Sequence, residues 1–124
     1  MSEEPIPENI RQFIVNKIDS IAHLEAILLF HSSPEHVFQT EEIANRLYVR
    51  EREARALLKD LEKSEFIIRN GDGYQYRSSP DLNPQISELS ETYARCLIPT
   101  TRLIHEKASK KIQQFANAFK FRED

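Results

Sequence analysis

The sequence predicts a mainly α-helical protein with one small β-hairpin. Only two glycines occur among 124 residues, and both lie in the tetrapeptide Asn70-Gly71-Asp72-Gly73. Glycine is the usual residue where a tight turn needs positive φ, so one tight hairpin is expected and little else of that kind. Elsewhere apolar residues recur at the i, i+3, i+4, i+7 spacing of amphipathic helices.

Two helices are expected before residue 34. Pro7 suits the start of the first helix, and Asp19 or Ser20 can cap the second, which Ser32-Ser33-Pro34 ends. The first stripe comprises Ile10, Phe13, Ile14, Lys17 and Ile18, and the second comprises Ile21, Leu24, Ile27, Leu28 and His31.

Residues 40–77 predict a helix, a tight turn, a second helix and two strands. Thr40 is the expected N-cap of the first helix, Tyr48-Val49 form the turn, and the second helix runs from about Arg50 to Glu65. The strands are Phe66–Arg69 and Tyr74–Arg77, and the short segment 37–39 can add a single β-bridge. This is the element order of a winged helix-turn-helix.

A long helix is expected after the linker 78–84. From residue 84 to 107 the apolar residues follow a heptad pattern, within which Pro99 should kink or split the helix. A last short helix would carry Ile112, Phe115, Ala116 and Phe119. The heptad stripe favours dimerisation, and packing on the first two helices of its own chain is the alternative. Its residues are Ile86, Leu89, Tyr93, Cys96, Leu97, Thr100, Leu103 and Ile104.

The expected organisation has three parts: an N-terminal helical extension over 1–19, a winged helix-turn-helix over 20–79 and a helical dimerisation region over 84–124. The single cysteine, Cys96, excludes an intramolecular disulfide. The sequence has no signal peptide and no apolar run near the length that spans a bilayer. These features predict a cytoplasmic protein without a membrane partner.

The second helix of the pair has two opposed faces. Ala54, Leu57, Leu58 and Leu61 form an apolar stripe, and a basic stripe lies opposite. Long cationic side chains on a helix can reach phosphates and base edges in a DNA groove. The alternative is a solvated helix with the ion pairs Glu51–Arg55, Arg50–Glu53, Lys59–Glu62 and Asp60–Lys63. The candidate nucleic-acid-binding residues are Arg52, Arg55, Lys59 and Lys63, with Arg69 and Arg77 beside the hairpin.

Residues 47–61, Leu-Tyr-Val-Arg-Glu-Arg-Glu-Ala-Arg-Ala-Leu-Leu-Lys-Asp-Leu, resemble the recognition-helix region of MarR-like and PadR-like winged helix-turn-helix proteins. With its Phe115–Arg122 tail, the chain also looks like a group of small bacterial regulators of this superfamily. The resemblance implies the fold and DNA binding, and it brings no enzymatic activity. Two positions differ: the family usually has a small capping residue in place of Arg50 and a glycine in place of Glu65.

The distribution of charge is uneven although the net charge is only -3. Residues 1–42 hold eight acids and two bases, residues 43–80 hold eight bases and six acids, and residues 99–122 hold six bases and one acid. The basic tail can attract phosphates, although cations at a helix C-terminus also stabilise its dipole. The tail residues are Lys107, Lys110, Lys111, Lys120 and Arg122.

Motifs for catalysis or cofactor binding are not found. The four histidines lack the spacing of a helical metal site, and the sequence contains no phosphate-binding or dinucleotide-binding glycine motif. We therefore expect no enzyme, no metal and no cofactor. Tyr74 and Tyr76 can stack on bases, but alternating aromatic residues in a hairpin more often pack across strands.

The sequence predicts a bacterial transcription regulator that binds duplex DNA as a homodimer. Arg52, Arg55 and Lys59 would enter the major groove, while Lys63, Arg69 and Arg77 would hold phosphates. The alternative is a winged-helix module that binds a protein partner and no DNA.

Overall fold

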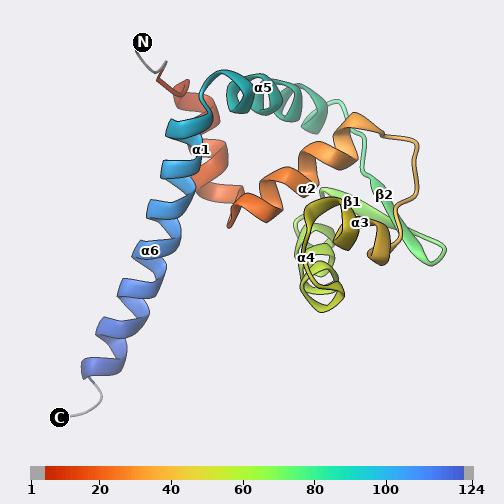
Figure 1. Cartoon of the computed structure of the whole chain (residues 1–124). Helices are drawn as coiled ribbons and strands as arrows, with labels where there is room; N and C mark the ends of the chain where they lie inside the picture. Colours follow the sequence, from red (N-terminus) through yellow and green to blue (C-terminus); the bar gives the residue numbers. More distant parts are fainter. Residues whose placement is uncertain (1–4, 122–124) are drawn as a thin grey trace. The chain divides into compact units, whose positions relative to one another are not determined.

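The structure is a computed structural model that describes residues 5–121, with the side chains of residues 5–110. The described chain is mainly helical with one two-stranded antiparallel hairpin, as the sequence predicts (Figure 1). It divides into two compact units, one of which joins the segment up to Ile21 to the segment from Thr92 onward, while Ala22–Glu91 form the other. The elements are α1 (Glu8–Lys17), α2 (Ile21–Ser32), α3 (Thr40–Leu47), α4 (Glu51–Lys63), β1 (Ile67–Asn70), β2 (Gly73–Tyr76), α5 (Leu82–Arg95) and α6 (Leu97–Phe121).

Helix α2 supplies much of the core of the 22–91 unit. Leu24 and Ile27 are buried as predicted, whereas Leu28 and His31 are only half-buried. Ala26 and Phe30 are also fully buried, and the Phe30 ring meets the edge of Phe38 at 4.9 Å between centroids. Helix α2 is therefore covered on more than one face, which a single stripe does not predict.

Helices α3 and α4 pack against each other through the predicted apolar faces. Ala54, Leu57, Leu58 and Leu61 of α4 are buried, and so are Ile43 and Ala44 of α3. The prediction that Thr40 caps α3 is wrong, because Gln39 is the N-cap and its carbonyl accepts the first helical hydrogen bond from Ile43 at 3.1 Å. Phe38, which precedes Gln39, forms a β-bridge with Tyr74, so the chain is still extended when it enters the helix.

The hairpin has a two-residue turn. Its register pairs Ile67 with Tyr76 and Asn70 with Gly73, and Gly71 adopts φ +63 at the first turn position. The predicted bridge forms between Phe38 and Tyr74, with two backbone hydrogen bonds of 2.7 and 2.9 Å. A Cβ atom on Gly73 would lie 2.7 Å from the Phe38 carbonyl oxygen, so the absence of a side chain permits this close approach.

The exit from α4 is a Schellman motif without glycine. Phe66 donates its N–H to the Leu61 carbonyl, and Glu65 donates to the Glu62 carbonyl, each at 3.0 Å. Glu65 adopts φ +67, which is the left-handed conformation that the resemblance assigns to glycine. The tight exit thus forms with a strained residue, since a Cβ disfavours positive φ.

Replacing Glu65 by glycine is expected to stabilise the protein. The side chain is exposed, and removing the Cβ relieves a strain of about 1–2 kcal/mol, which the greater backbone entropy of glycine offsets by about 0.5–1 kcal/mol. A gain of up to about 1 kcal/mol should appear as a higher urea midpoint at unchanged m-value. A lower midpoint would mean that the Glu65 side chain itself stabilises the fold.

The predicted helix over 84–107 is two helices. Helix α5 begins before Pro84, where the Ser79 hydroxyl accepts a hydrogen bond from the Leu82 N–H at 3.0 Å, and the break with α6 falls at Cys96. Pro99 lies in the first turn of α6, where its missing N–H removes no helical hydrogen bond. Proline therefore splits the helix. Helix α6 continues to Phe121, so the predicted last short helix is part of it.

The other unit packs α1 against α6. Ile10, Phe13 and Ile14 of α1 are buried, whereas Lys17 is exposed instead of lying along this stripe. Thr92 and Thr100 are fully buried, and neither hydroxyl has a hydrogen-bond partner in the described part of the chain. The side chains of Ile112, Phe115, Ala116 and Phe119 lie outside the described residues.

Candidate functional site

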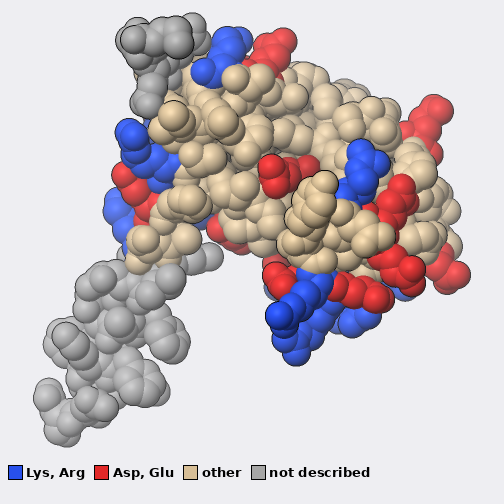
Figure 2. Space-filling view, viewed as in Figure 1, with Lys and Arg blue, Asp and Glu red and all other residues tan. Residues whose placement is uncertain are grey.

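The outer face of α4 carries the candidate nucleic-acid-binding residues. Four buried residues on the opposite face fix the rotation of the helix, so the predicted basic stripe points to solvent. Figure 2 shows Lys and Arg side chains gathered over α4, with Asp and Glu side chains beside them. The exposed cations of this stripe are Arg52, Arg55, Lys59 and Lys63.

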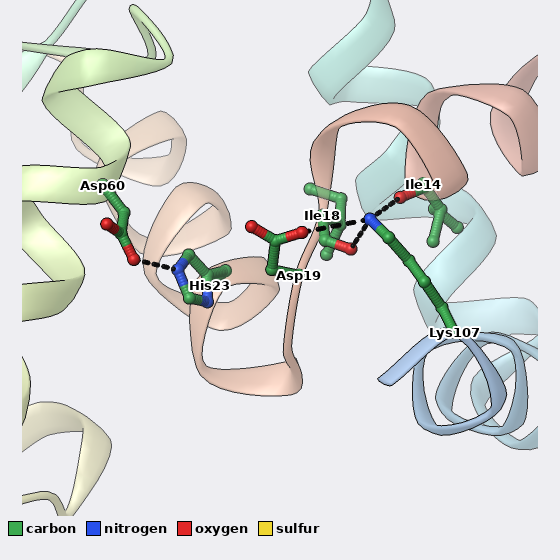
Figure 3. Close-up of polar contacts among 6 residues, drawn as sticks. All are labelled: Ile14, Ile18, Asp19, His23, Asp60 and Lys107. Carbon is green, nitrogen blue, oxygen red and sulfur yellow. Dashed lines mark hydrogen bonds and ion pairs between the residues drawn. The ribbon is translucent and has the colours of Figure 1, made fainter. Parts of the chain in front are cut away.

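Only one of the four predicted ion pairs on α4 forms. Arg55 donates to the Glu51 carboxylate at 3.2 Å, between side chains that are both more than half exposed. Asp60 instead meets His23 of α2, with 3.0 Å between Oδ2 and Nε2 (Figure 3). Within the part of the chain that has described side chains, Arg52, Lys59 and Lys63 form no hydrogen bond or ion pair. These three cations are therefore available to a ligand.

The hairpin places its two arginines on opposite faces. Side chains alternate along a strand, and the register puts Arg69 on the face of Tyr74 and Tyr76, whereas Arg77 follows the face of Ile68 and Gln75. Arg69 donates to the Tyr74 hydroxyl at 3.2 Å, and its guanidinium lies 5.4 Å from the centre of that ring. Arg77 is exposed beyond β2. Because they lie on opposite faces of the hairpin, Arg69 and Arg77 are not expected to contact the same DNA strand together.

The hairpin tyrosines are buried. Tyr74 and Tyr76 therefore pack across the strands, and neither offers a ring face to a base. The Tyr76 hydroxyl donates to the Asn83 side chain at 2.8 Å, and burial raises the pKa of this phenol above its ordinary value. The protonated phenol links β2 to the start of α5.

The predicted dimerisation stripe is mostly buried inside the chain. Tyr93 and Leu103 are half-buried, and Leu97 is 51% exposed beside Ile98, which is 54% exposed. The residues that the stripe offers to a second copy are therefore few. The buried members are Ile86, Leu89, Cys96, Thr100 and Ile104.

The described part of the basic tail has a structural contact. Lys107 donates to the Ile18 carbonyl at 2.7 Å and to Asp19 at 3.2 Å, so its amine is occupied at the end of α1. Lys110 is exposed. Both lysines line a groove of about 320 Å³ between α1 and α6, together with Arg11 and Glu106. Lys111, Lys120 and Arg122 lie outside the described residues.

Three of the described histidines, including His23, have separate polar partners. His36 meets the Glu42 carboxylate at 2.9 Å, and His31 meets the Ser87 hydroxyl at 3.2 Å. No group of three His, Cys, Asp or Glu side chains that could hold a metal ion occurs among the residues that the structure describes. Within the same residues, no helix is long and apolar enough to cross a membrane.

Comparisons with protein-family models, curated proteins and solved structures give no match for this chain.

The structure adds three residues beside the predicted stripe. Arg46, Tyr48 and Arg50 lie at the turn between α3 and α4, and all are exposed. The helical periodicity of α4 alone does not include them, because Arg46 lies in the last turn of α3 and Tyr48 and Arg50 precede α4. The three arginines of the segment 46–52 are the sequence feature from which these residues could have been identified.

Proposed function

We propose that this chain is a nucleic-acid-binding protein of the winged-helix class. In this proposal α4 is the recognition helix and the hairpin is the wing. The order of α3, turn, α4, β1 and β2 supports the proposal, as does the outward direction of the basic side chains on α4. Within this class we propose a homodimeric, cytoplasmic transcription regulator of bacterial type that binds duplex DNA.

One observation carries the proposal: α4 holds unpaired cations on a helix that is fixed from behind. Arg52, Lys59 and Lys63 are exposed without a carboxylate partner, and Leu57 and Leu58 are buried on the opposite side. Side chains on a rigid helix lose less entropy on binding than side chains on a loop. Guanidinium and ammonium groups are the usual donors to phosphates and to guanine edges.

The intramolecular partners of the six cations indicate which of them can bind DNA directly. Arg52 and Lys59 are free to reach base edges, and Lys63 is free to hold a phosphate. Arg55 must first leave Glu51, and Arg69 must first leave Tyr74, so both should contribute less. Arg77 remains the candidate phosphate contact of the hairpin.

Titration of a labelled duplex of random sequence tests the proposal. At about 50 mM salt the protein should bind, and affinity should fall steeply towards about 200 mM as counterions are released. The triple variant Arg52→Ala/Arg55→Ala/Lys59→Ala should lose at least about tenfold in affinity, and its salt slope should be shallower. Anisotropy of the labelled duplex measures both quantities.

A matched variant separates this face from general charge. Arg11→Ala/Lys17→Ala/Arg102→Ala removes three exposed cations of the α1–α6 unit and changes the net charge equally. It should bind duplex like the unaltered protein. Equal losses in the two triple variants would exclude α4 as the binding face, and absence of binding by the unaltered protein at low salt would exclude the function. Light scattering of the complex gives the number of copies bound.

The second candidate is a protein-interaction module without DNA binding. The adjacent exposed side chains of Leu97 and Ile98 favour it, because contiguous exposed apolar residues often mark protein contacts. Recovery of one stoichiometric protein from a pull-down, together with no affinity for duplex, would support this candidate instead.

A further inference from the structure

The side chain of Tyr48 has no role within the described part of the fold. It adopts φ +57 at the C-cap of α3, and its side chain is 94% exposed. Positive φ is rare for bulky residues, and glycine or asparagine would adopt it more readily. Its side chain forms no hydrogen bond or ring contact with any described residue. The aromatic side chain therefore brings strain without a compensating hydrogen bond or ring contact to any described residue.

Three unpaired arginines surround Tyr48 in the chain. Arg46 lies in the last turn of α3, Arg50 is the N-cap of α4, and Arg52 lies in the first turn of α4. All three are exposed, and none has a hydrogen bond or ion pair from its side chain to a described residue. Tyr48 is the exposed aromatic side chain among the described residues, and it lies in the same segment as these three unpaired arginines.

The acids near this segment leave the three guanidinium groups uncompensated. Glu51 is the only acid between residues 46 and 52, and its carboxylate already bonds Arg55 at 3.2 Å. Farther along α4, the exposed Asp60 and Glu62 lie next in sequence to Lys59 and Lys63. Glu53 is also exposed next to Arg52, but no acid of the described residues forms an ion pair with Arg46, Arg50 or Arg52. The segment therefore offers three unpaired guanidinium groups to an anion.

The chemistry of this segment fits a chain of phosphates. Arginine pairs bidentately with phosphate oxygens, and the tyrosine hydroxyl is a common donor to the DNA backbone. A protein partner would require a desolvated apolar centre, but Leu47 and Val49 are half-buried beneath the turn. Unpaired guanidinium groups without an exposed aliphatic centre therefore fit a nucleic-acid backbone better than a protein surface.

We infer that the turn between α3 and α4 binds the phosphate backbone of duplex DNA. Tyr48 donates its hydroxyl to a phosphate oxygen, and Arg46 and Arg50 pair with that phosphate and its neighbours, while Arg52 keeps its proposed role at base edges. This inference rests on the proposed function and adds a backbone anchor at the N-terminal end of α4. Because backbone contacts carry no sequence information, their loss should weaken binding to all duplexes alike.

Tyr48→Gly tests the anchor without endangering the fold. Glycine removes the hydroxyl and relieves the positive φ, so the variant should be at least as stable to urea as the unaltered protein. Its affinity for random-sequence duplex should fall about tenfold, as expected for a lost hydrogen bond to a charged group. Tyr48→Phe should reproduce most of this loss, because it keeps the ring and removes only the donor.

Glu65→Gly is the matched control. It makes the same backbone change at the other end of α4 and should leave the affinity for duplex unchanged. If both glycine variants lose affinity equally, the effect arises from the mobility of α4, and the inference is wrong. If Tyr48→Gly binds duplex as tightly as the unaltered protein, the inference is wrong while the proposed function stands.

Fluorescence provides a direct measurement of the contact. The chain contains no tryptophan, so Tyr48→Trp introduces a single tryptophan at the turn, and Leu97→Trp introduces one on α6. Adding duplex should change the emission of Trp at position 48 and leave that at position 97 unaltered. A response only to single-stranded DNA would indicate base stacking and overturn the assignment to a duplex backbone. Failure of the unaltered protein to bind duplex at low salt overturns the inference and the proposed function together.

Discussion

Replacing Gly73 by alanine is expected to destabilise the 22–91 unit by about 3 kcal/mol. The new Cβ would meet the Phe38 carbonyl oxygen and the Val37 side chain, each at 2.7 Å. Backbone atoms cannot move aside as the end of a flexible side chain can. The segment before α3 must therefore separate from β2, and the two hydrogen bonds between Phe38 and Tyr74 would weaken or break. Urea unfolding followed by circular dichroism measures the loss.

Gly71→Ala is the control for this substitution. A Cβ on Gly71 meets no atom within 4 Å, so only the strain of φ +63 remains, at about 1 kcal/mol. The two variants make the same chemical change, one within the turn and one at the strand residue that follows it. Equal stabilities for the two variants would show that the close approach of Gly73 to Phe38 does not destabilise Gly73→Ala.

Removing the amine of Lys107 by substitution with methionine is expected to cost about 2–3 kcal/mol. The ammonium group donates to the Ile18 carbonyl at 2.7 Å, to the Ile14 carbonyl at 3.4 Å and to Asp19 at 3.2 Å (Figure 3). The last carbonyls of a helix lack intrahelical partners, and a cation there also complements the helix dipole. The side chain is 17% exposed, so water replaces these bonds poorly.

Lys110→Met supplies the comparison for Lys107→Met. Lys110 is exposed, and its replacement by methionine removes the same charge as Lys107→Met. This variant should therefore change the unfolding free energy by less than about 0.5 kcal/mol. Hydrogen exchange should locate the effect of Lys107→Met in the last turn of α1. Unchanged protection there would contradict the capping role, even if the global stability fell.

The helices and the hairpin were predictable because their signals are local. The apolar stripe of α4 and the glycine-rich turn each depend on neighbouring residues only, and both appear where expected. The burial of Phe30 was not predictable, because it depends on Phe38, which follows in a later segment. Pro99 indicated that the predicted helix would kink or split, and the break at Cys96 directly follows Arg95, the residue whose carbonyl the proline ring would meet in a continuous helix.

The candidate site was predictable in its residues and less so in its pairings. The exposure of Arg52 and Lys59 follows from the rotation of α4. Spacing on one helix suggested that Asp60 would pair with Lys63, whereas the structure pairs Asp60 with His23 of another helix. Partners from other segments compete with partners on the same helix, and a periodicity argument contains no information about them.

The left-handed residues at Tyr48 and Glu65 have a consequence for how α4 can respond to any partner. A residue at positive φ cannot join a right-handed helix, so neither end of α4 can add a turn without first rearranging one of these residues. A shift of α4 by one residue in its register against the core would rotate every outward side chain by about 100°. Because both ends of α4 are fixed, the directions in which its outward side chains point are set before any ligand binds. A binding surface must therefore match this arrangement.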